Sequence, residues 1–375
     1  MKLSKYISSF VLAASAAMAF TSCSDEKFTD TIFPETGDGL DPNAYTYKFD
    51  KWLKQEYLDV YNLEFRYKMQ DVGTDMNYNL VPAEYDKAKD LAVLVKYLWF
   101  DAYKEVVGGE VFLQAYGPRI IHIIGSPAYN PQTGSMVLGL AEGGIKVSLF
   151  RVNSLDLTDF SQLNEYYFKT MHHEFAHILH QTKSIPQSFY TISTGRYDDN
   201  NWQDQVEGRM NSLGFVTTYA SSQLREDFAE TLANYVTKTD EQWARMMELA
   251  ARGWESPAGN ESAKPGDYYC FYFYPNNDAS QSKSYLDESQ IRKRDDGTYY
   301  YPGHYDTSGN DIEVYAVEDT DGVDGVAIIN QKVSIVRQWL DEEWGIDLDK
   351  LREVVQRRQL NYNIEELRKA IDEVQ

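Results

Sequence analysis

The chain has 375 residues, of which 43% are hydrophobic and 25% are charged, and its formal net charge is -22. This length and hydrophobic share are enough for a buried core, in one large domain or two small ones, and they exclude a mostly disordered chain. The acidity argues against nucleic acid as a partner, because phosphate contacts need clustered Lys and Arg. The 2 Cys exclude a disulfide scaffold and a Cys-based zinc finger, so any metal has to bind His and carboxylates.

The first residues have the composition of a bacterial secretion signal. A short basic stretch precedes an apolar run, residues 7–20, which is too short to span a bilayer comfortably and has the length of a signal h-region. The run leads into small residues and Cys23, and this resembles a lipobox with Phe20 in place of the usual Leu. The sequence therefore predicts a lipoprotein signal peptide over residues 1–22 and lipidation of Cys23. An ordinary signal peptide cut nearby is the alternative.

Residues 23–45 are polar, contain Gly and Pro, and are predicted to form a flexible tether. The acidic stretch after Cys23 resembles the surface-export signal of some Gram-negative outer-membrane lipoproteins, although a solvated charged tether would look the same. We therefore expect an outer-membrane lipid anchor through Cys23, with the protein facing the cell exterior. The sequence leaves the oligomeric state open, and a monomer is the default.

The rest of the chain alternates helical and strand patterns. Helices are predicted over residues 47–58, 82–107, 159–181, 224–236, 241–251, 328–343, 348–358 and 364–374, and strands over residues 61–69, 118–124, 135–140 and 145–152. Residues 253–325 are rich in Gly, Ser, Asn, Asp and Tyr, and they predict an insertion with long loops. The order predicts an α+β fold: a domain over residues 46–252, the insertion, and a helical C-terminal part over residues 326–375.

The most specific motif is the HExxH pattern of residues 173–177, inside predicted helix 159–181. Side chains at i and i+4 share a helix face about 5–6 Å apart at Cβ. Both His173 and His177 can therefore reach one zinc ion at about 2.0–2.1 Å. Zinc lowers the pKa of a bound water toward about 7, and Glu174 can take the proton from that water. The pattern predicts one catalytic Zn²⁺; a solvated His-rich helix face is the alternative.

A catalytic zinc also needs a third protein ligand. His180 lies two turns from His173, about 10.5 Å along the helix, so it cannot share a metal with both motif histidines. His172 faces another side of the helix. The remaining candidates are Glu226 and Glu230, which are spaced i,i+4 and share one helix face, as one ligand and one supporting carboxylate would. A solvated acidic helix edge is the alternative.

The motifs together resemble a known family. HHEFAHILHQ at residues 172–181 and EDFAE at residues 226–230 resemble the gluzincin-type zinc metallopeptidases, and most closely a zinc-binding metallopeptidase family of bacterial surface lipoproteins. DKWL at residues 50–53 and YNLEF at residues 61–65 also resemble that family. The resemblance covers most of the mature chain apart from the tether and residues 253–325. It implies a zincin-like metalloprotease fold, with a small mixed sheet, a backing helix and an HExxH active-site helix.

The resemblance also implies roles for single residues. Glu226 would be the third zinc ligand, Tyr219 would stabilise the oxyanion, and Glu230 would orient a histidine ligand. A strand over residues 144–152 or 134–140 would form the sheet edge that pairs with a bound peptide. The expected function is a zinc-dependent metallopeptidase that hydrolyses peptide bonds of extracellular proteins or peptides through a zinc-activated water.

Two other functions remain open. The chain could hold zinc without catalysis and capture proteins or glycans at the surface for nutrient uptake, but the retained Glu174 argues against this because a metal scaffold does not need it. The 29 Tyr could also form a glycan-stacking surface, although packing in the core and the loops is favoured.

Overall fold

The structure is a computed structural model, and it describes residues 39–69, 79–131, 134, 136–137, 139–142 and 145–374. The predicted signal peptide, Cys23 and most of the predicted tether lie outside these residues. The chain divides into two compact units, one ending at Lys51 and one beginning at Trp52. A search of the described residues found no helix that is long and apolar enough to cross a membrane.

Three long helices each contain one turn of π-helix. Their segments are α2 (Tyr47–Leu53), η1 (Lys54–Leu58) and α3 (Asp59–Tyr61); α4 (Tyr85–Val95), η2 (Lys96–Phe100) and α5 (Asp101–Val107); and α7 (Phe160–Leu163), η4 (Asn164–Phe168) and α8 (Lys169–Thr182). The other α-helices are α6 (Val111–Tyr116), α9 (Gln187–Ile192), α10 (Glu207–Ser212), α11 (Leu224–Thr237), α12 (Asp240–Ala250), α13 (Gly325–Trp344), α14 (Leu348–Asn361) and α15 (Ile364–Asp372). The predicted helices are thus all present, with shifted ends.

The helix predicted to begin at Pro82 begins at Tyr85 instead. Pro82 forms an isolated β-bridge with Ile124, and the side chain of Asn153 accepts a hydrogen bond from the backbone N–H of Glu84 at 2.7 Å. Residues 82–84 are therefore held by the neighbouring segments in an extended path. The sequence carries a proline signal for the helix start but no signal for these long-range contacts.

The central sheet is mixed and has the strand order β1-β2-β6-β5. Its strands are β1 (Glu64–Arg66), β2 (Ile120–Ile123), β5 (Gly139–Glu142) and β6 (Lys146–Leu149). The first three in this order are parallel, and β5 is antiparallel to β6. Because β6 is paired on both sides, the prediction of residues 144–152 as the sheet edge is wrong, and β5 ends the sheet instead. A separate antiparallel pair joins β3 (Ala128–Tyr129) and β4 (Met136–Val137).

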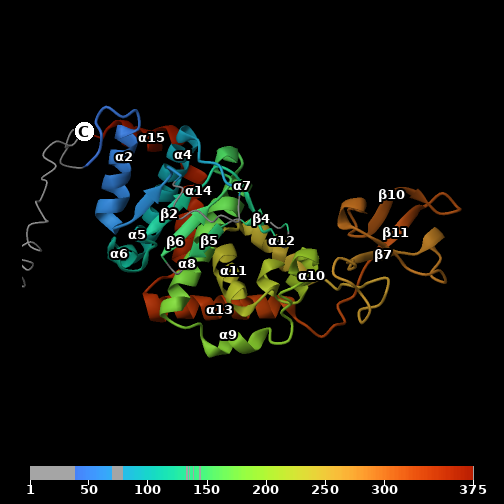
Figure 1. The fold of residues 1–375 in the computed structure, drawn as a ribbon. Helices are drawn as coiled ribbons and strands as arrows, with labels where there is room; N and C mark the ends of the chain where they lie inside the picture. Colours follow the sequence, from blue (N-terminus) through green and yellow to red (C-terminus); the bar gives the residue numbers. More distant parts are fainter. Residues whose placement is uncertain are drawn as a thin grey trace, which may run out of the picture. The chain divides into compact units, whose positions relative to one another are not determined.

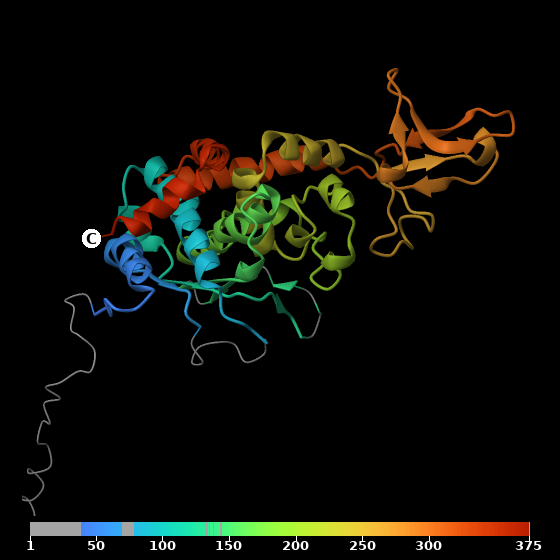
Figure 2. The same ribbon diagram turned by 90° about the horizontal axis from the view of Figure 1, so that it is seen from above.

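The helices α4, α5 and α8 lie on one side of this sheet (Figures 1 and 2). An aromatic cluster packs the helix formed by α4, η2 and α5 against α8. The rings of Trp99 and Tyr103 meet the ring of Phe175 edge-on, with centroids 5.0 and 5.2 Å apart, and all three side chains are buried. Burying one such side chain stabilises the fold by about 1.5–3 kcal/mol. The cluster therefore fixes the helix that carries the HExxH motif.

Residues 253–325 contain a five-stranded antiparallel sheet that the sequence did not predict, together with long loops such as residues 253–270. The order is β8-β7-β11-β10-β9, with β7 (Phe271–Phe273), β8 (Ser284–Leu286), β9 (Arg292–Lys293), β10 (Tyr299–Tyr305) and β11 (Asp311–Ala316). It has its own small core, which includes Phe271, Leu286 and Val314. Most of these strands are too short to show a clear alternation in the sequence, and that is why the pattern was missed.

On the face of this sheet opposite its core, one row of tyrosines crosses three strands. Tyr315 of β11 pairs in register with Tyr272 of β7, which pairs with Tyr285 of β8. The rings of Tyr272 and Tyr315 stack at 5.6 Å, and the ammonium group of Lys283 lies over Tyr272. The Tyr-rich composition thus serves both the cores and a partly exposed row.

A buried ion pair joins α11 to α13. Asp227 and Lys332 have side chains that are 0% exposed, and their charged atoms lie 2.6 Å apart. Lys332 also donates to the carbonyl of Gly214 at 2.7 Å, and the hydroxyl of Tyr197 donates to Asp227 at 2.9 Å. Burial raises the pKa of Asp227 and lowers that of Lys332, while their mutual attraction opposes both shifts. The pair ties the C-terminal helices to the helix that carries Glu226.

Removing one partner of this pair should destabilise the fold strongly. We expect Lys332→Met to lower the free energy of unfolding by about 3–5 kcal/mol, because it leaves the Asp227 carboxylate buried and unpaired. Denaturant unfolding followed by circular dichroism measures the change. The control is Lys369→Met, which removes an exposed pair with Glu366 and should leave unfolding unchanged. An equal, small effect of both substitutions would contradict a structural role for the buried pair.

Candidate metal centre

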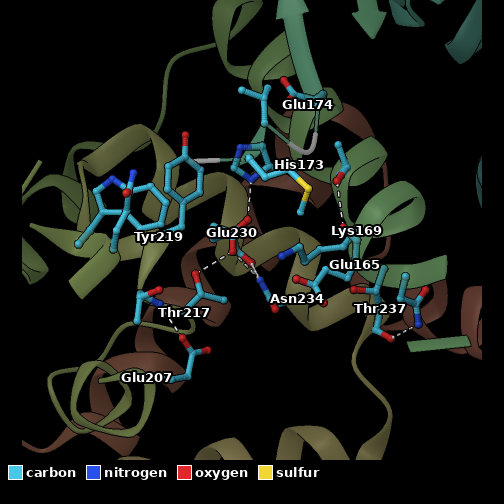
Figure 3. Close-up of a pocket in the computed structure, with 18 of the residues that line it drawn as sticks. Glu165, Lys169, His173, Glu174, Glu207, Thr217, Tyr219, Glu230, Asn234 and Thr237 are labelled. Carbon is cyan, nitrogen blue, oxygen red and sulfur yellow. Dashed lines mark hydrogen bonds and ion pairs between the residues drawn. The ribbon is translucent and has the colours of Figure 1, made fainter. Parts of the chain in front are cut away.

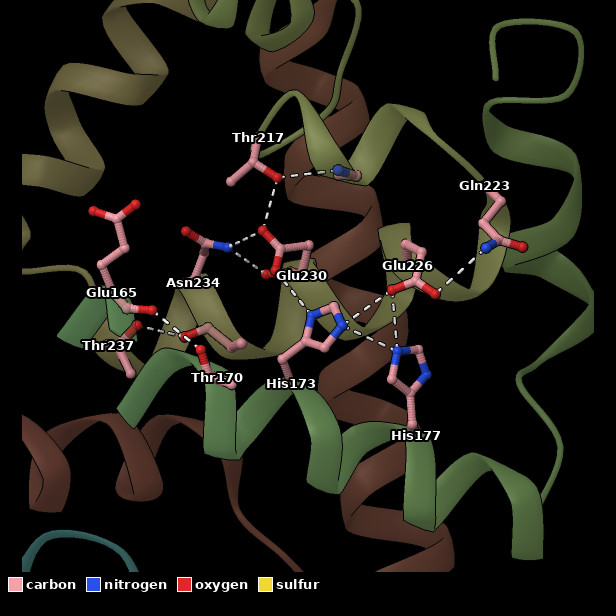
Figure 4. A network of polar contacts seen from close by, with 12 residues as sticks. Glu165, Thr170, His173, His177, Thr217, Gln223, Glu226, Glu230, Asn234 and Thr237 are labelled. Atoms are coloured by element: carbon pink, nitrogen blue, oxygen red, sulfur yellow. Dashed lines mark hydrogen bonds and ion pairs between the residues drawn. The ribbon is translucent and has the colours of Figure 1, made fainter. Parts of the chain in front are cut away.

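Two neighbouring helices bring the predicted ligands together. His173 and His177 lie one turn apart on α8, and Glu226 lies in the first turn of α11. The Nε2 atoms of the two imidazoles are 3.0 Å apart, and Oε2 of Glu226 lies 3.0 Å from the first and 3.1 Å from the second (Figure 4). Among the described residues, these three are the group of His, Cys, Asp and Glu side chains with the geometry to hold a metal ion.

The ring tautomers explain why this cluster suits a cation. Nδ1 of His173 lies 2.8 Å from Oε1 of Glu230, and Nδ1 of His177 lies 2.7 Å from Nε2 of His180. If each Nδ1 donates a proton to its partner, each neutral ring presents a lone pair at Nε2. Two lone pairs and a carboxylate oxygen then face one another at about 3 Å, an arrangement that needs a proton or a metal ion between them. Tetrahedral zinc, with bonds of about 2.0–2.1 Å, sets its ligand atoms about 3.3 Å apart. The donor set and its spacing therefore fit zinc.

Buried hydrogen bonds fix the carboxylate of Glu230. It accepts from the hydroxyl of Thr217 at 2.7 Å and from the side-chain amide of Asn234 at 3.1 Å, besides its contact with His173. Asn234 lies four residues after Glu230 on α11, so the helical spacing could have revealed it. Thr217 comes from the segment before α11, and the sequence gives no sign of it. Oε1 of Glu230 thus lies 2.8 Å from Nδ1 of His173, and the supporting role that the resemblance implies for it stays a prediction.

His180, which the sequence excludes as a third ligand, contacts His177 instead. The two rings are perpendicular, at 83°, with centroids 5.0 Å apart, and Phe228 of α11 packs edge-on against His180. Burial lowers the pKa of His180 to about 4, so its ring is neutral near pH 7 and can accept a hydrogen bond from His177. Its place beside a candidate ligand was not predicted from the sequence. His172 faces away and contacts the hydroxyl of Tyr103 at 3.0 Å.

Without a metal, the surrounding carboxylates hold a proton on the cluster. Burial favours the neutral form of His173, but its hydrogen bonds to Glu226 and Glu230 outweigh burial and raise its pKa to about 10. Burial also opposes the charge of Glu226, yet the bonds to His173 and His177 hold the pKa of this carboxyl well below its usual range. The raised pKa of His173 therefore favours a proton on the metal-free cluster near neutral pH.

A cavity of about 890 Å³ opens beside the cluster (Figure 3). Glu174 and Tyr219 both line it. Glu174 is mostly buried at 8% exposure, next to β5. At Gly139 of this strand, an added Cβ would lie 2.2 Å from the side chain of Thr170, so β5 approaches α8 this closely only because residue 139 is glycine. The edge strand and the HExxH helix thus share one wall of the cavity.

Tyr219 lies against the cluster in a short 3₁₀ turn, η6 (Tyr219–Ser221). Its ring stacks on that of His173, with centroids 5.8 Å apart and 30° between the planes, and the ring of Trp202 also contacts it, with centroids 4.8 Å apart. Burial and the neighbouring carboxylate of Glu226 raise the pKa of Tyr219 well above its usual value. The phenol therefore keeps its proton and remains a hydrogen-bond donor at the edge of the cavity.

A mixed α+β fold that sets two helical histidines against a glutamate of a second helix has the candidate metal site expected of the zinc metallopeptidase class. The profile of a family described as "Putative zinc-binding metallo-peptidase" matches residues 42–349, and the chain belongs to this family. A crystal structure of a protein with that description from Bacteroides caccae ATCC 43185 is 33% identical, with a TM-score of 0.59, and the match covers 90% of this chain and 97% of that one. A search of curated proteins found no match.

The protonated His173 gives zinc binding a measurable signature. At pH 8 the metal-free cluster still holds a proton, because the pKa of His173 is raised to about 10. Zinc has to displace this proton, so we expect release of about one proton per zinc bound and an affinity that rises with pH up to about 10. Calorimetric titration in two buffers of different ionisation enthalpy counts the protons. Zinc binding without proton release at pH 8 would contradict a raised pKa of His173 in the metal-free cluster.

Proposed function

We propose that the chain is a zinc-dependent peptidase that hydrolyses peptide bonds of extracellular proteins or peptides. The observation that carries this proposal is the convergence of the His173, His177 and Glu226 side chains on one point at a cavity that Glu174 also lines. The first three residues would hold the metal, and Glu174 follows the first ligand directly on α8. A metal site that only holds zinc needs neither this carboxylate nor the cavity.

Bound zinc would lower the pKa of a water molecule and polarise the carbonyl of the scissile bond. Glu174 accepts the proton from the attacking water and then passes it to the leaving amine, so one carboxylate acts as both base and acid. Its partial burial removes it from bulk water and keeps it on the cavity wall. Tyr219 donates its hydroxyl proton in a hydrogen bond to the oxyanion that forms at the carbonyl.

The edge strand β5 supports the binding of an extended peptide. β5 ends the sheet beside α8, and its backbone is antiparallel to that of β6. A peptide that adds to this edge would run antiparallel to β5, with main-chain hydrogen bonds that do not depend on sequence. The close approach that Gly139 permits brings such a peptide next to Glu174. Residues 134–140, the second of the two predicted edges, overlap this strand.

The location of the protein remains a proposal from the sequence. A signal peptide over residues 1–22 and a lipid on Cys23 would anchor the chain to the outer membrane, facing the cell exterior. Residues 23–45 would hold the enzyme away from the lipid surface. An enzyme held there by a polar tether would reach proteins and peptides outside the cell, in agreement with the proposed substrates.

Replacing Glu174 tests the mechanism directly. We expect Glu174→Ala to keep one zinc per chain and to lower the rate of peptide hydrolysis at least 100-fold, because the general base and acid is lost while the ligands stay. Metal analysis and a quenched fluorescent peptide library measure the two properties. Glu353→Gln, on the exposed face of α14, is the matched control for a lost carboxylate.

The metal ligands are tested in the same series. Glu226→Ala and His173→Ala should lower zinc content and activity together. Full peptidase activity in Glu174→Ala would overturn the mechanism, and unchanged zinc content in Glu226→Ala would reject Glu226 as the third ligand. A wild-type chain that holds zinc and cleaves no peptide would favour the non-catalytic alternative.

We also propose that His180 positions His177. As acceptor of the Nδ1 proton, its ring would fix the tautomer of His177 that presents a lone pair to zinc. We expect His180→Ala to weaken zinc binding about tenfold, and His180→Gln to restore part of this loss because the amide oxygen can also accept. Competition with a fluorescent chelator measures the affinity. His304→Ala, an exposed histidine of the insertion, is the control. Unchanged zinc affinity in His180→Ala would refute the role.

A further inference from the structure

Two lysines lie on the wall of the cavity beside the metal cluster. Lys169 is the first residue of α8, one turn before His173, and Lys238 follows directly after the end of α11. Both line the cavity that Glu174 and Tyr219 share. Figure 3 shows the side chain of Lys169 extending toward Asn234 and Glu230. The two helices that build the metal cluster thus also place two ammonium groups near it.

These ammonium groups differ from the carboxylates around them in their hydrogen bonding. Glu230 accepts from Thr217 and Asn234 and contacts His173, as described above. Glu207 accepts from the backbone N–H of Thr218 at 2.9 Å. Within the described part of the chain, neither lysine has an ion pair within 4.0 Å or a hydrogen bond from its ammonium group, and Glu230 and Glu207 act on them only at longer range. Although several carboxylates also line the cavity, these two ammonium groups keep donors free for a ligand that brings acceptors.

The pKa of Lys238 also indicates that the two ammonium groups are not fully neutralised by nearby carboxylates. Burial lowers the pKa of Lys238, the carboxylate of Glu207 opposes the shift, and the positive charge of Lys169 adds to it. The two ammonium groups are thus near enough to repel each other. An anion between them would relieve this repulsion and offset the cost of burial. The competing features are the carboxylates of Glu165, Asp199 and Glu207, which also line the cavity and are exposed.

We propose that Lys169 and Lys238 form a subsite that binds a carboxylate of the peptide substrate next to the scissile bond. This inference rests on the proposed function, because it gives a specificity to the same active site. The carboxylate can belong to an Asp or Glu side chain or to the C-terminus of a short peptide. Apolar side chains are disfavoured there, because they would remove water from two ammonium groups and return no hydrogen bond.

The test compares matched peptides on the zinc-loaded chain. One quenched fluorescent scaffold with an amidated C-terminus carries Asp, Asn, Leu or Lys at each position that flanks the scissile bond. We expect Asp to be cleaved with a kcat/KM about tenfold higher than Asn at one of these positions, and the ratio to shrink as salt is added. A shortened Asn peptide is then tested with a free and with an amidated C-terminus. Faster cleavage of the free form shows that the subsite binds a terminal carboxylate, and equal cleavage shows that it binds a side-chain carboxylate.

Substitution then assigns the preference to residues. Lys169→Gln and Lys238→Gln should each lower kcat/KM for the preferred carboxylate peptide more than for its neutral counterpart, so that the ratio falls severalfold. The control is Lys183→Gln at the other end of α8, whose ammonium group pairs with Glu343 outside the cavity. It should leave both the rate and the ratio unchanged.

Several outcomes would overturn the subsite while the peptidase stands. The first is equal cleavage of each carboxylate peptide and its neutral counterpart. The second is a preference for Lys, which would point to the cavity carboxylates instead. The third is a ratio that stays the same in both lysine variants. If the wild type cleaves no peptide, the proposed function fails by itself. Calorimetric binding of the Asp and Asn peptides to zinc-loaded Glu174→Gln then decides the subsite, and equal affinities reject it.

Discussion

The arrangement on which the site depends is the approach of two imidazole nitrogens and one carboxylate oxygen to about 3 Å of one another. Such a cluster is unfavourable without a cation, because lone pairs and negative charge face one another in a partly buried place. The fold must therefore hold α8 against α11 firmly enough to impose it. The aromatic cluster around Phe175 fixes α8, and Glu230 joins the two helices through His173.

The helix α11 connects the site to the rest of the chain because carboxylates on its different faces contact different helices. Glu226 and Glu230 are one turn apart and point to α8. Asp227, one residue further round the helix, is buried against Lys332 of α13. The C-terminal helices contribute no candidate ligand among the described residues. Through Asp227 they orient α11, which carries Glu226, the proposed third ligand. Because α11 is held from both sides, the Glu226 carboxylate keeps its position near the two histidines.

The sequence predicted the parts of the site that depend on local helical spacing. His173, His177 and the Glu226–Glu230 pair follow from i,i+4 geometry, and the mixed α+β fold follows from the order of periodic segments. The contacts it missed are of another kind. Thr217 reaches Glu230 from a separate segment, and the strands of residues 253–325 are mostly too short to show a period. His180 had the right spacing but was judged only as a ligand. These features could not be predicted because they depend on tertiary contacts and not on a periodic pattern in the sequence.

The two histidines differ in the charge of their supporting groups, and this difference bears on the chemistry. His173 is supported by the anionic Glu230, whereas His177 is supported by the neutral ring of His180. An anionic partner makes a ligand more basic and strengthens metal binding, but every added negative charge also weakens the metal as a Lewis acid. With Glu226 as a ligand and Glu174 on the cavity wall, the site already carries three carboxylates. In the proposed mechanism, a neutral partner for His177 would supply orientation without a fourth negative charge, and the metal would keep the positive charge that polarises a peptide carbonyl.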